Sequence, residues 1–137
     1  MNAEEAARRW IELYNDVEPG TYGSDRFVEL YASDIRWRES PTPVTPDGRS
    51  ADDIAAFREA LEWGKTFFTD RNVTLHEIVA DGDRAAMLYT WSATVAVDLG
   101  PEGAPVGARP RVEVATFLRV ADGKIVEHTD LAGSATW

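Results

Sequence analysis

Near its carboxyl end the sequence reads Asp122-Gly-Lys-Ile-Val-Glu-His-Thr-Asp-Leu131, and this segment predicts the last hairpin of a β-sheet. Its Asp-Gly pair lies between two runs rich in β-branched residues, which is a strong signal for a two-residue turn. His128 and Asp130 are two residues apart, so on a strand both side chains leave the same face. An imidazole beside a carboxylate can accept and pass on protons, provided that this face lines a sheltered cavity.

The register of this hairpin decides which side chains surround the histidine and the acid. Counting outward from a two-residue turn places Phe117 opposite His128 and Ala115 opposite Asp130. The small Ala115 side chain leaves room above the carboxylate. In this register the same face also carries Arg111, Glu113, Arg119 and Val126.

The hydrophobic pattern also allows the opposite arrangement. The other face of the two strands carries Val112, Val114, Leu118, Val120, Ile125 and Leu131. In an antiparallel sheet the more apolar face is normally the buried one. On that interpretation His128 and Asp130 are solvated surface charges, so both alternatives remain open at this point.

The amino-terminal segment is predicted to be helical. Apolar residues recur at three- and four-residue steps from Ala6 to Val17, which predicts an amphipathic helix that ends at Pro19-Gly20. Ser24 is a predicted N-cap for a short second helix. Ser50, followed three residues later by an acid, resembles a capping box and predicts a third helix over residues 51–68.

Strands are expected over residues 35–39, 73–79, 84–97 and 111–121, and again from Lys124. His76, on the second of these strands, is interpreted as a structural or surface residue. The predicted order is ααβαββββ, with an antiparallel meander after the helices. We therefore expect one α+β domain over residues 1–137.

Composition excludes several classes of function. The net charge of −10 argues against nucleic acid and anionic membranes as partners, because both would repel the protein. The absence of cysteine excludes thiol catalysis and disulfides. The two histidines lack the spacing of a metal site, and no glycine-rich phosphate loop occurs, so we expect neither metal nor cofactor. An acidic amino terminus without a long apolar run predicts a cytoplasmic protein.

The predicted element order, the segment Asp34-Ile-Arg-Trp-Arg-Glu-Ser-Pro41 and the Asp122–Asp130 ending together resemble the SnoaL-like branch of the NTF2-like superfamily. The resemblance spans nearly the whole chain. It implies a strongly curved antiparallel sheet wrapped around the helices as a cone, with a pocket for a small hydrophobic molecule at the open end. It also implies a homodimer formed through the outer sheet surface, which would give both sheet faces an apolar role.

The resemblance further implies a cofactor-free cyclase or isomerase that acts by general acid–base catalysis. Asp130 would be the general base, with burial raising its pKa, and His128 or Glu39 would donate or relay a proton. The residues expected to line the pocket are Trp37, Phe117, Ala115, Tyr14 and Phe67. An epoxide hydrolase is less favoured, because the Tyr, Asn, Arg and Asp of such relatives are replaced here by Trp37, Glu39, Ser92 and Thr94.

The alternative is a non-catalytic NTF2-like module for ligand binding or dimerisation. The two interpretations differ in what they require of the cavity. A volume of roughly 300 Å³ or more with Asp130 at its wall favours catalysis or binding. A cavity closed by Trp37, Phe67 and Phe117 favours a structural role.

Overall fold

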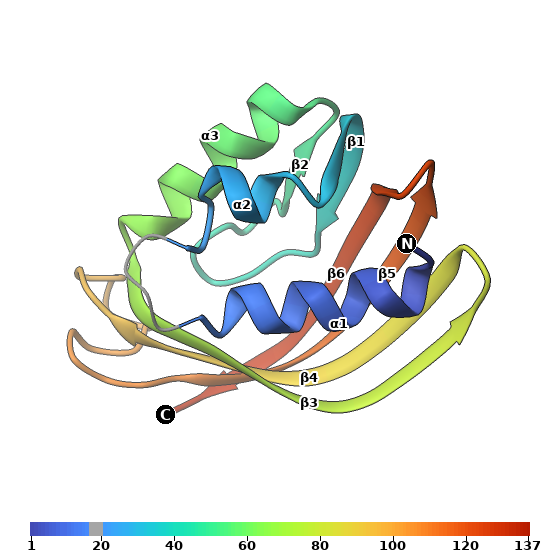
Figure 1. Ribbon diagram of the computed structural model, residues 1–137. Coiled ribbons are helices and arrows are strands. Elements are labelled where there is room, and N and C mark those ends of the chain that lie inside the picture. Colours follow the sequence, from blue (N-terminus) through green and yellow to red (C-terminus); the bar gives the residue numbers. More distant parts are fainter. Residues whose placement is uncertain (17–20) are drawn as a thin grey trace.

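The structure is a computed structural model that describes residues 1–16 and 21–137 (Figure 1). In this part of the chain the helices and strands follow one another in the order ααββαββββ. Their bounds are α1 Ala3–Tyr14, α2 Asp25–Val28, β1 Tyr31–Glu39, β2 Arg49–Ala51, α3 Ile54–Lys65, β3 Phe68–Asp81, β4 Arg84–Val95, β5 Arg111–Ala121 and β6 Lys124–Thr136.

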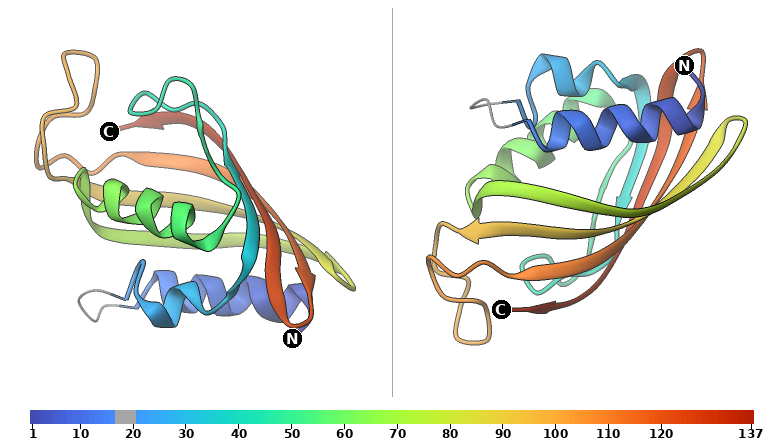
Figure 2. Two further views of the ribbon diagram at one scale, coloured as in Figure 1. Left: turned by 90° about the horizontal axis from the view of Figure 1, so that it is seen from above. Right: turned by 60° about the horizontal axis from the view of Figure 1, so that its bottom comes forward.

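The strands form one sheet in the order β2-β1-β6-β5-β4-β3. The long strands curve strongly, the sheet does not close, and the helices lie on its concave side (Figures 1 and 2). The predicted α+β cone is therefore confirmed. The sheet is mixed rather than wholly antiparallel, because β1 runs parallel to β6. That pairing joins distant segments, and an alternating hydrophobic pattern carries no information about the relative direction of two strands.

Local capping signals explain where the helices begin. The side chain of Asn2 accepts a hydrogen bond from the Glu5 backbone N–H at 2.9 Å, and Glu5 bonds back to Asn2, which completes a capping box for α1. Ser24 caps α2 as predicted. The predicted cap of the third helix was wrong: Ser50 lies in β2, and Asp53 caps α3 instead. None of the helices in residues 1–16 and 21–137 is long and apolar enough to cross a membrane.

Several element boundaries differ from the prediction. The third helix begins at Ile54 and ends at Lys65, because β3 begins at Phe68 and extends to Asp81. Strand β1 begins at Tyr31 instead of residue 35. Strand β2 has only three residues, too few for an alternating pattern to be recognised. The predicted end of the first helix, Val17 to Pro19-Gly20, lies outside the described residues.

The terminal hairpin has the predicted turn but not the predicted register. Asp122 and Gly123 both have positive φ, 51° and 74°, as a type I′ turn requires. Near the turn Val120 pairs with Ile125, but after a register shift Leu118 faces His128. Strand β6 therefore contains one extra residue, a β-bulge between Ile125 and the histidine.

This bulge decides which face each side chain occupies. The predicted pairs Phe117 with His128 and Ala115 with Asp130 were wrong by one residue, since Thr116 faces Asp130. The apolar face of β5 is buried, as its pattern indicated, and so is Ile125. Beyond the bulge His128 joins the same inner face. The two alternatives left open by the sequence are thus both partly correct.

Candidate active site

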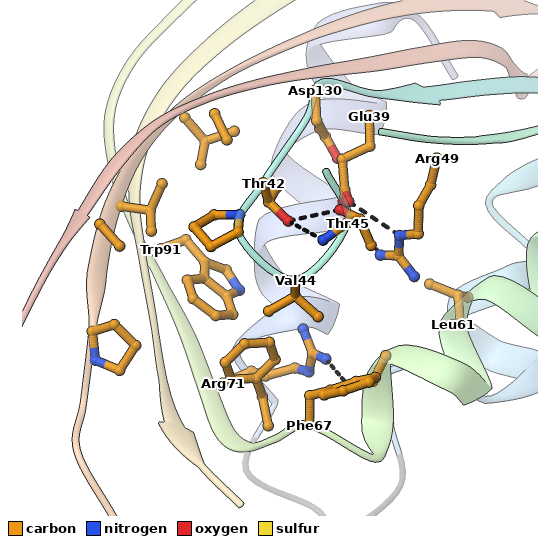
Figure 3. A pocket seen from close by; sticks show the side chains of 18 of the residues that line it. Glu39, Thr42, Val44, Thr45, Arg49, Leu61, Phe67, Arg71, Trp91 and Asp130 are labelled. Atoms are coloured by element: carbon orange, nitrogen blue, oxygen red, sulfur yellow. Dashed lines mark hydrogen bonds and ion pairs between the residues drawn. The ribbon is translucent and has the colours of Figure 1, made fainter. Parts of the chain in front are cut away.

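A cavity of about 350 Å³ lies between the concave face of the sheet, the helices and the loops after β1 and β4. Most of its wall is aromatic, with Trp10, Tyr14, Trp37, Phe67, Phe68 and Trp91 among the lining residues. Its charged lining includes Glu39, Arg49, Arg71 and Asp130 (Figure 3). The volume suits a small, mostly apolar ligand that makes a few polar contacts.

Asp130 is the centre of a buried hydrogen-bond network. Its Oδ1 accepts hydrogen bonds from His128 Nε2 at 2.8 Å and from Thr116 Oγ1 at 2.6 Å. On the far side of the ring, His128 Nδ1 lies 3.0 Å from the Tyr31 hydroxyl. Because Thr116 donates to the carboxylate, the hydroxyl of Tyr89, 2.8 Å away, donates to Thr116. We call these five residues the Asp130 cluster.

The two oxygens of Asp130 have different surroundings. Both hydrogen bonds end on Oδ1, and no described residue donates to Oδ2. The side chain keeps 16% of its surface exposed, whereas that of His128 keeps 3%. The geometry therefore holds one oxygen from behind and leaves the other open to the cavity.

Asp130 is ionised at neutral pH. Burial acts to raise its pKa, but the electrostatic interaction with His128, the hydrogen bonds from His128 and Thr116, and the charge of Arg49 together lower the pKa below its usual value. The expected rise was wrong in direction, because the sequence did not reveal these donors. Burial, followed by the negative charge of Asp130, raises the pKa of Tyr31 and Tyr89, so both hydroxyls keep their protons.

Glu39 faces Asp130 across the parallel β1–β6 pair and enters the same cavity (Figure 3). Its carboxylate binds Arg49 through both oxygens, at 3.1 Å to Nε and 3.3 Å to Nη2. The guanidinium also lies over the Trp37 and Trp63 rings, 5.0 and 5.2 Å from their centroids. Both carboxylate oxygens of Glu39 are thus engaged by Arg49 in a bidentate ion pair, so contact of this carboxylate with a ligand competes with the pair.

The structure brings together most of the residues singled out from the sequence. Asp130, His128, Glu39, Trp37, Tyr14 and Phe67 all line the cavity. Ala115 and Phe117 do not, which corrects the prediction. Both lie on the outer face of β5, where Ala115 pairs with Leu131 and Phe117 is 49% exposed, and the bulge in β6 turns His128 and Asp130 to the inner face instead.

The sequence analysis missed Thr116, Tyr31, Arg49 and Arg71. Thr116 carried a recognisable signal, because it is the one polar residue among the inward-facing positions of an otherwise Val/Leu strand. Arg71 shares the strand parity of buried Val73, which marked it as inward-facing. Arg49 and Tyr31 had no such signal.

Comparisons with known proteins agree with this geometry. A family model for the SnoaL-like domain matches residues 7–128. No significant match occurs among curated proteins.

Solved structures with the same fold share little sequence with this chain. IdmH of Streptomyces antibioticus, provisionally assigned as a polyketide cyclase, is 23% identical with a TM-score of 0.70, covering 94% of this chain and 90% of its own. AclR of Streptomyces galilaeus, provisionally assigned as a hydroxylase, is 22% identical with a TM-score of 0.70, covering 95% and 87%. A Catenulispora acidiphila protein with a ketosteroid isomerase-like fold is 16% identical with a TM-score of 0.71, covering 97% and 88%.

Proposed function

The chain belongs to the SnoaL-like family, and we propose that it is a cofactor-independent enzyme that uses Asp130 as general base on a small hydrophobic carbonyl compound. The observation that carries this proposal is the unequal treatment of the two Asp130 oxygens. One is held by His128 and Thr116, and the other is open to an aromatic cavity. The provisional assignment of its structural neighbour IdmH as a polyketide cyclase supports cyclisation or isomerisation as the class of reaction.

In the proposed mechanism Oδ2 of Asp130 removes a proton from a carbon next to a carbonyl group. The electron pair of the broken C–H bond moves onto the carbonyl oxygen and forms an enolate. In a cyclisation the enolate carbon then attacks a second carbonyl group, and the alkoxide that forms takes the proton back from Asp130. In an isomerisation the substrate is an unsaturated ketone, and its conjugated enolate takes the proton from Asp130 at a different carbon. His128 and Thr116 are positioning residues in this mechanism, because both direct a hydrogen bond to Oδ1 of Asp130.

The developing enolate oxygen needs a hydrogen-bond donor. His128 is not available, because both ring nitrogens are engaged and the side chain is buried. Tyr14 is a better candidate. Its hydroxyl oxygen accepts hydrogen bonds from Trp91 Nε1 at 2.8 Å and Arg71 Nη1 at 3.1 Å, while no described residue accepts its own hydrogen. Burial, opposed by the charge of Arg71, raises the pKa of Tyr14 to about 12, so the proton is retained.

The test follows the first chemical step and does not require the natural product. A panel of aryl alkyl ketones and cyclic unsaturated ketones is incubated in D2O, and deuterium incorporation next to the carbonyl is followed by NMR. We expect the wild-type protein to accelerate exchange for those ketones that raise its melting temperature. Asp130→Asn should lose about 100- to 10,000-fold of that rate. Equal rates in the two proteins would remove Asp130 as the base.

A ligand-binding protein without turnover is the second candidate. The lowered pKa of Asp130 favours it, because a carboxylate stabilised in its charged form is a weaker base. In that case the ketones bind and raise the melting temperature, but wild-type protein adds no exchange above the buffer rate.

A further inference from the structure

Arg71 is a cation that the proposed mechanism leaves largely unused. It begins the inward-facing part of β3 and lines the cavity. Figure 3 shows its side chain at the opposite end of the drawn site from Asp130 and Glu39. Its known hydrogen bonds go to neutral oxygens, from Nη1 to the Tyr14 hydroxyl at 3.1 Å and from Nη2 to the Gly64 carbonyl at 2.9 Å.

No carboxylate of the described residues forms an ion pair with Arg71. Glu39 is engaged by Arg49 through both oxygens, and Asp130 is held by His128 and Thr116. Glu102 also lines the cavity, but it is solvent-exposed and makes no ion pair with Arg71. A guanidinium has five N–H donors, so several donors of Arg71 remain available to a ligand.

Aromatic rings partly replace the missing anion. The Arg71 guanidinium lies 4.3 Å from the ring centroid of Tyr22 and 5.6 Å from that of Phe68. Such cation–π contacts offset part of the desolvation of a cation, but a carboxylate would offset more, because it also accepts the remaining N–H groups.

The backbone at Gly64 makes room for this arrangement. A Cβ at this position would lie 3.3 Å from Nη2 of Arg71 and 3.8 Å from Nη1 of Arg49. Glycine therefore allows two guanidinium groups to approach the same turn of α3, although only Arg49 has a carboxylate partner there.

We propose that Arg71 binds a carboxylate group of the ligand, so that the substrates of this protein are keto acids rather than neutral ketones. The inference rests on the function proposed above, because it concerns the far end of the same cavity. The carboxylate would lie against Arg71, and the carbonyl group would lie toward Tyr14 and Asp130. A planar monoanion fits one guanidinium in a small aromatic cavity, since the two can form paired N–H···O bonds.

The experiment uses a matched pair of probes, 4-oxo-4-phenylbutanoate and its carboxamide, which have the same shape and differ by one charge. Isothermal titration calorimetry on the wild-type protein should give a Kd about 10-fold or more lower for the carboxylate. In Arg71→Gln the ratio should fall to about 1, whereas Arg71→Lys should keep part of it. Arg109→Gln, which removes an exposed positive charge outside the cavity, should keep the full ratio.

The two Kd values measured on the wild-type protein can by themselves overturn the inference, so the test does not depend on whether Arg71→Gln folds. Equal Kd values for the two probes, or a carboxylate Kd above about 1 mM, would show that Arg71 only ties α1 and α3 to the sheet. Isotope exchange separates this failure from failure of the proposed function. If Asp130→Asn abolishes exchange but both probes exchange equally fast, Asp130 is the base and Arg71 is not an anion site. If the carboxylate binds more tightly but exchange persists in Asp130→Asn, Arg71 is an anion site and Asp130 is not the base.

Discussion

The sheet carries a second histidine–threonine–carboxylate cluster on the face opposite the cavity. There His76 Nε2 lies 2.6 Å from Thr90 Oγ1, which donates to Glu113 Oε1 at 2.6 Å. His76 Nε2 is also 3.6 Å from Glu113 Oε2. We call this the outer cluster. It shares a histidine, a threonine and a carboxylate with the Asp130 cluster, and also the threonine-to-acid hydrogen bond of 2.6 Å, but its histidine is hydrogen-bonded to the threonine instead of the acid.

The two clusters differ in burial. The side chains of His76 and Glu113 are 44% and 62% exposed, whereas those of His128 and Asp130 are 3% and 16% exposed. Water competes for each bond of the outer cluster and screens its charges, so such surface pairs contribute little. The comparison shows that these residue types alone do not define the site, because the histidine, threonine and acid of the outer cluster do not line the cavity.

The largest difference should appear in catalysis. We expect Asp130→Asn to reduce ketone isotope exchange by about 100- to 10,000-fold, because it removes the base. Glu113→Gln, the matched change in the outer cluster, should stay within about twofold of wild type, since it touches no ligand. The measurement is the rate of deuterium incorporation into the same ketone, followed by NMR with each variant. A loss shared by both variants would mean that the faces are not functionally distinct.

Replacing the threonine of each cluster, Thr116 or Thr90, should change the free energy of unfolding by different amounts. Thr116 has no exposed surface, and Thr116→Val leaves the Tyr89 hydroxyl without its acceptor and Asp130 without one of its two donors. We expect a loss of about 1–3 kcal/mol in the free energy of unfolding. Thr90 is itself buried, at 6% exposed, but Thr90→Val should cost less, because its partners His76 and Glu113 are exposed and water can replace the bonds that they lose. Urea denaturation measures both, and equal losses would contradict the role of burial.

The pH dependence of stability should sharpen the comparison further. The pKa of Asp130 is lower in the folded protein than its usual value, so the unfolded chain binds more protons in acid. Asp130 therefore contributes stability above the unfolded pKa of about 3.9, and this contribution is lost as the pH falls through the folded value. Asp130→Asn should show a shallower fall in unfolding free energy between neutral and acidic pH. If the unfolding free energies of wild type and Asp130→Asn change with pH in parallel, the pKa of Asp130 is not lowered in the folded protein.

A substitution on the outer face of the sheet should have the smallest effect on ligand binding in the cavity. Phe117 is half-exposed there, next to the exposed pair Leu88 and Leu131, so Phe117→Asp should leave the Kd of a cavity ligand within about twofold. The homodimer expected from the sequence would cover this face and shield the outer cluster. Sedimentation velocity should then show a wild-type dimer that Phe117→Asp weakens. If the wild-type protein is a monomer at every concentration tested, the outer cluster is exposed to solvent and the predicted homodimer is wrong.

Local signals in the sequence predicted a large part of this molecule. The Asp122-Gly123 turn, the Ser24 cap and strand β5 lie where they were expected. Each depends on residues close together in the chain, where turn geometry and side-chain period act directly. The family resemblance added the curvature of the sheet and the inward direction of Asp130.

Long-range packing determined the rest. Ile125 and His128 both enter the inner face, which a regular strand cannot do across an odd number of steps, and the bulge supplies the extra residue. That one residue turns His128 and Asp130 to the inner face, so that Thr116 of β5, and not Phe117, is their neighbour in the site. The parallel pairing of β1 with β6, which brings Glu39 opposite Asp130, is likewise beyond any local pattern. Hydrophobic periodicity names the residues that can be buried, but only contacts between distant strands select the register that buries them together.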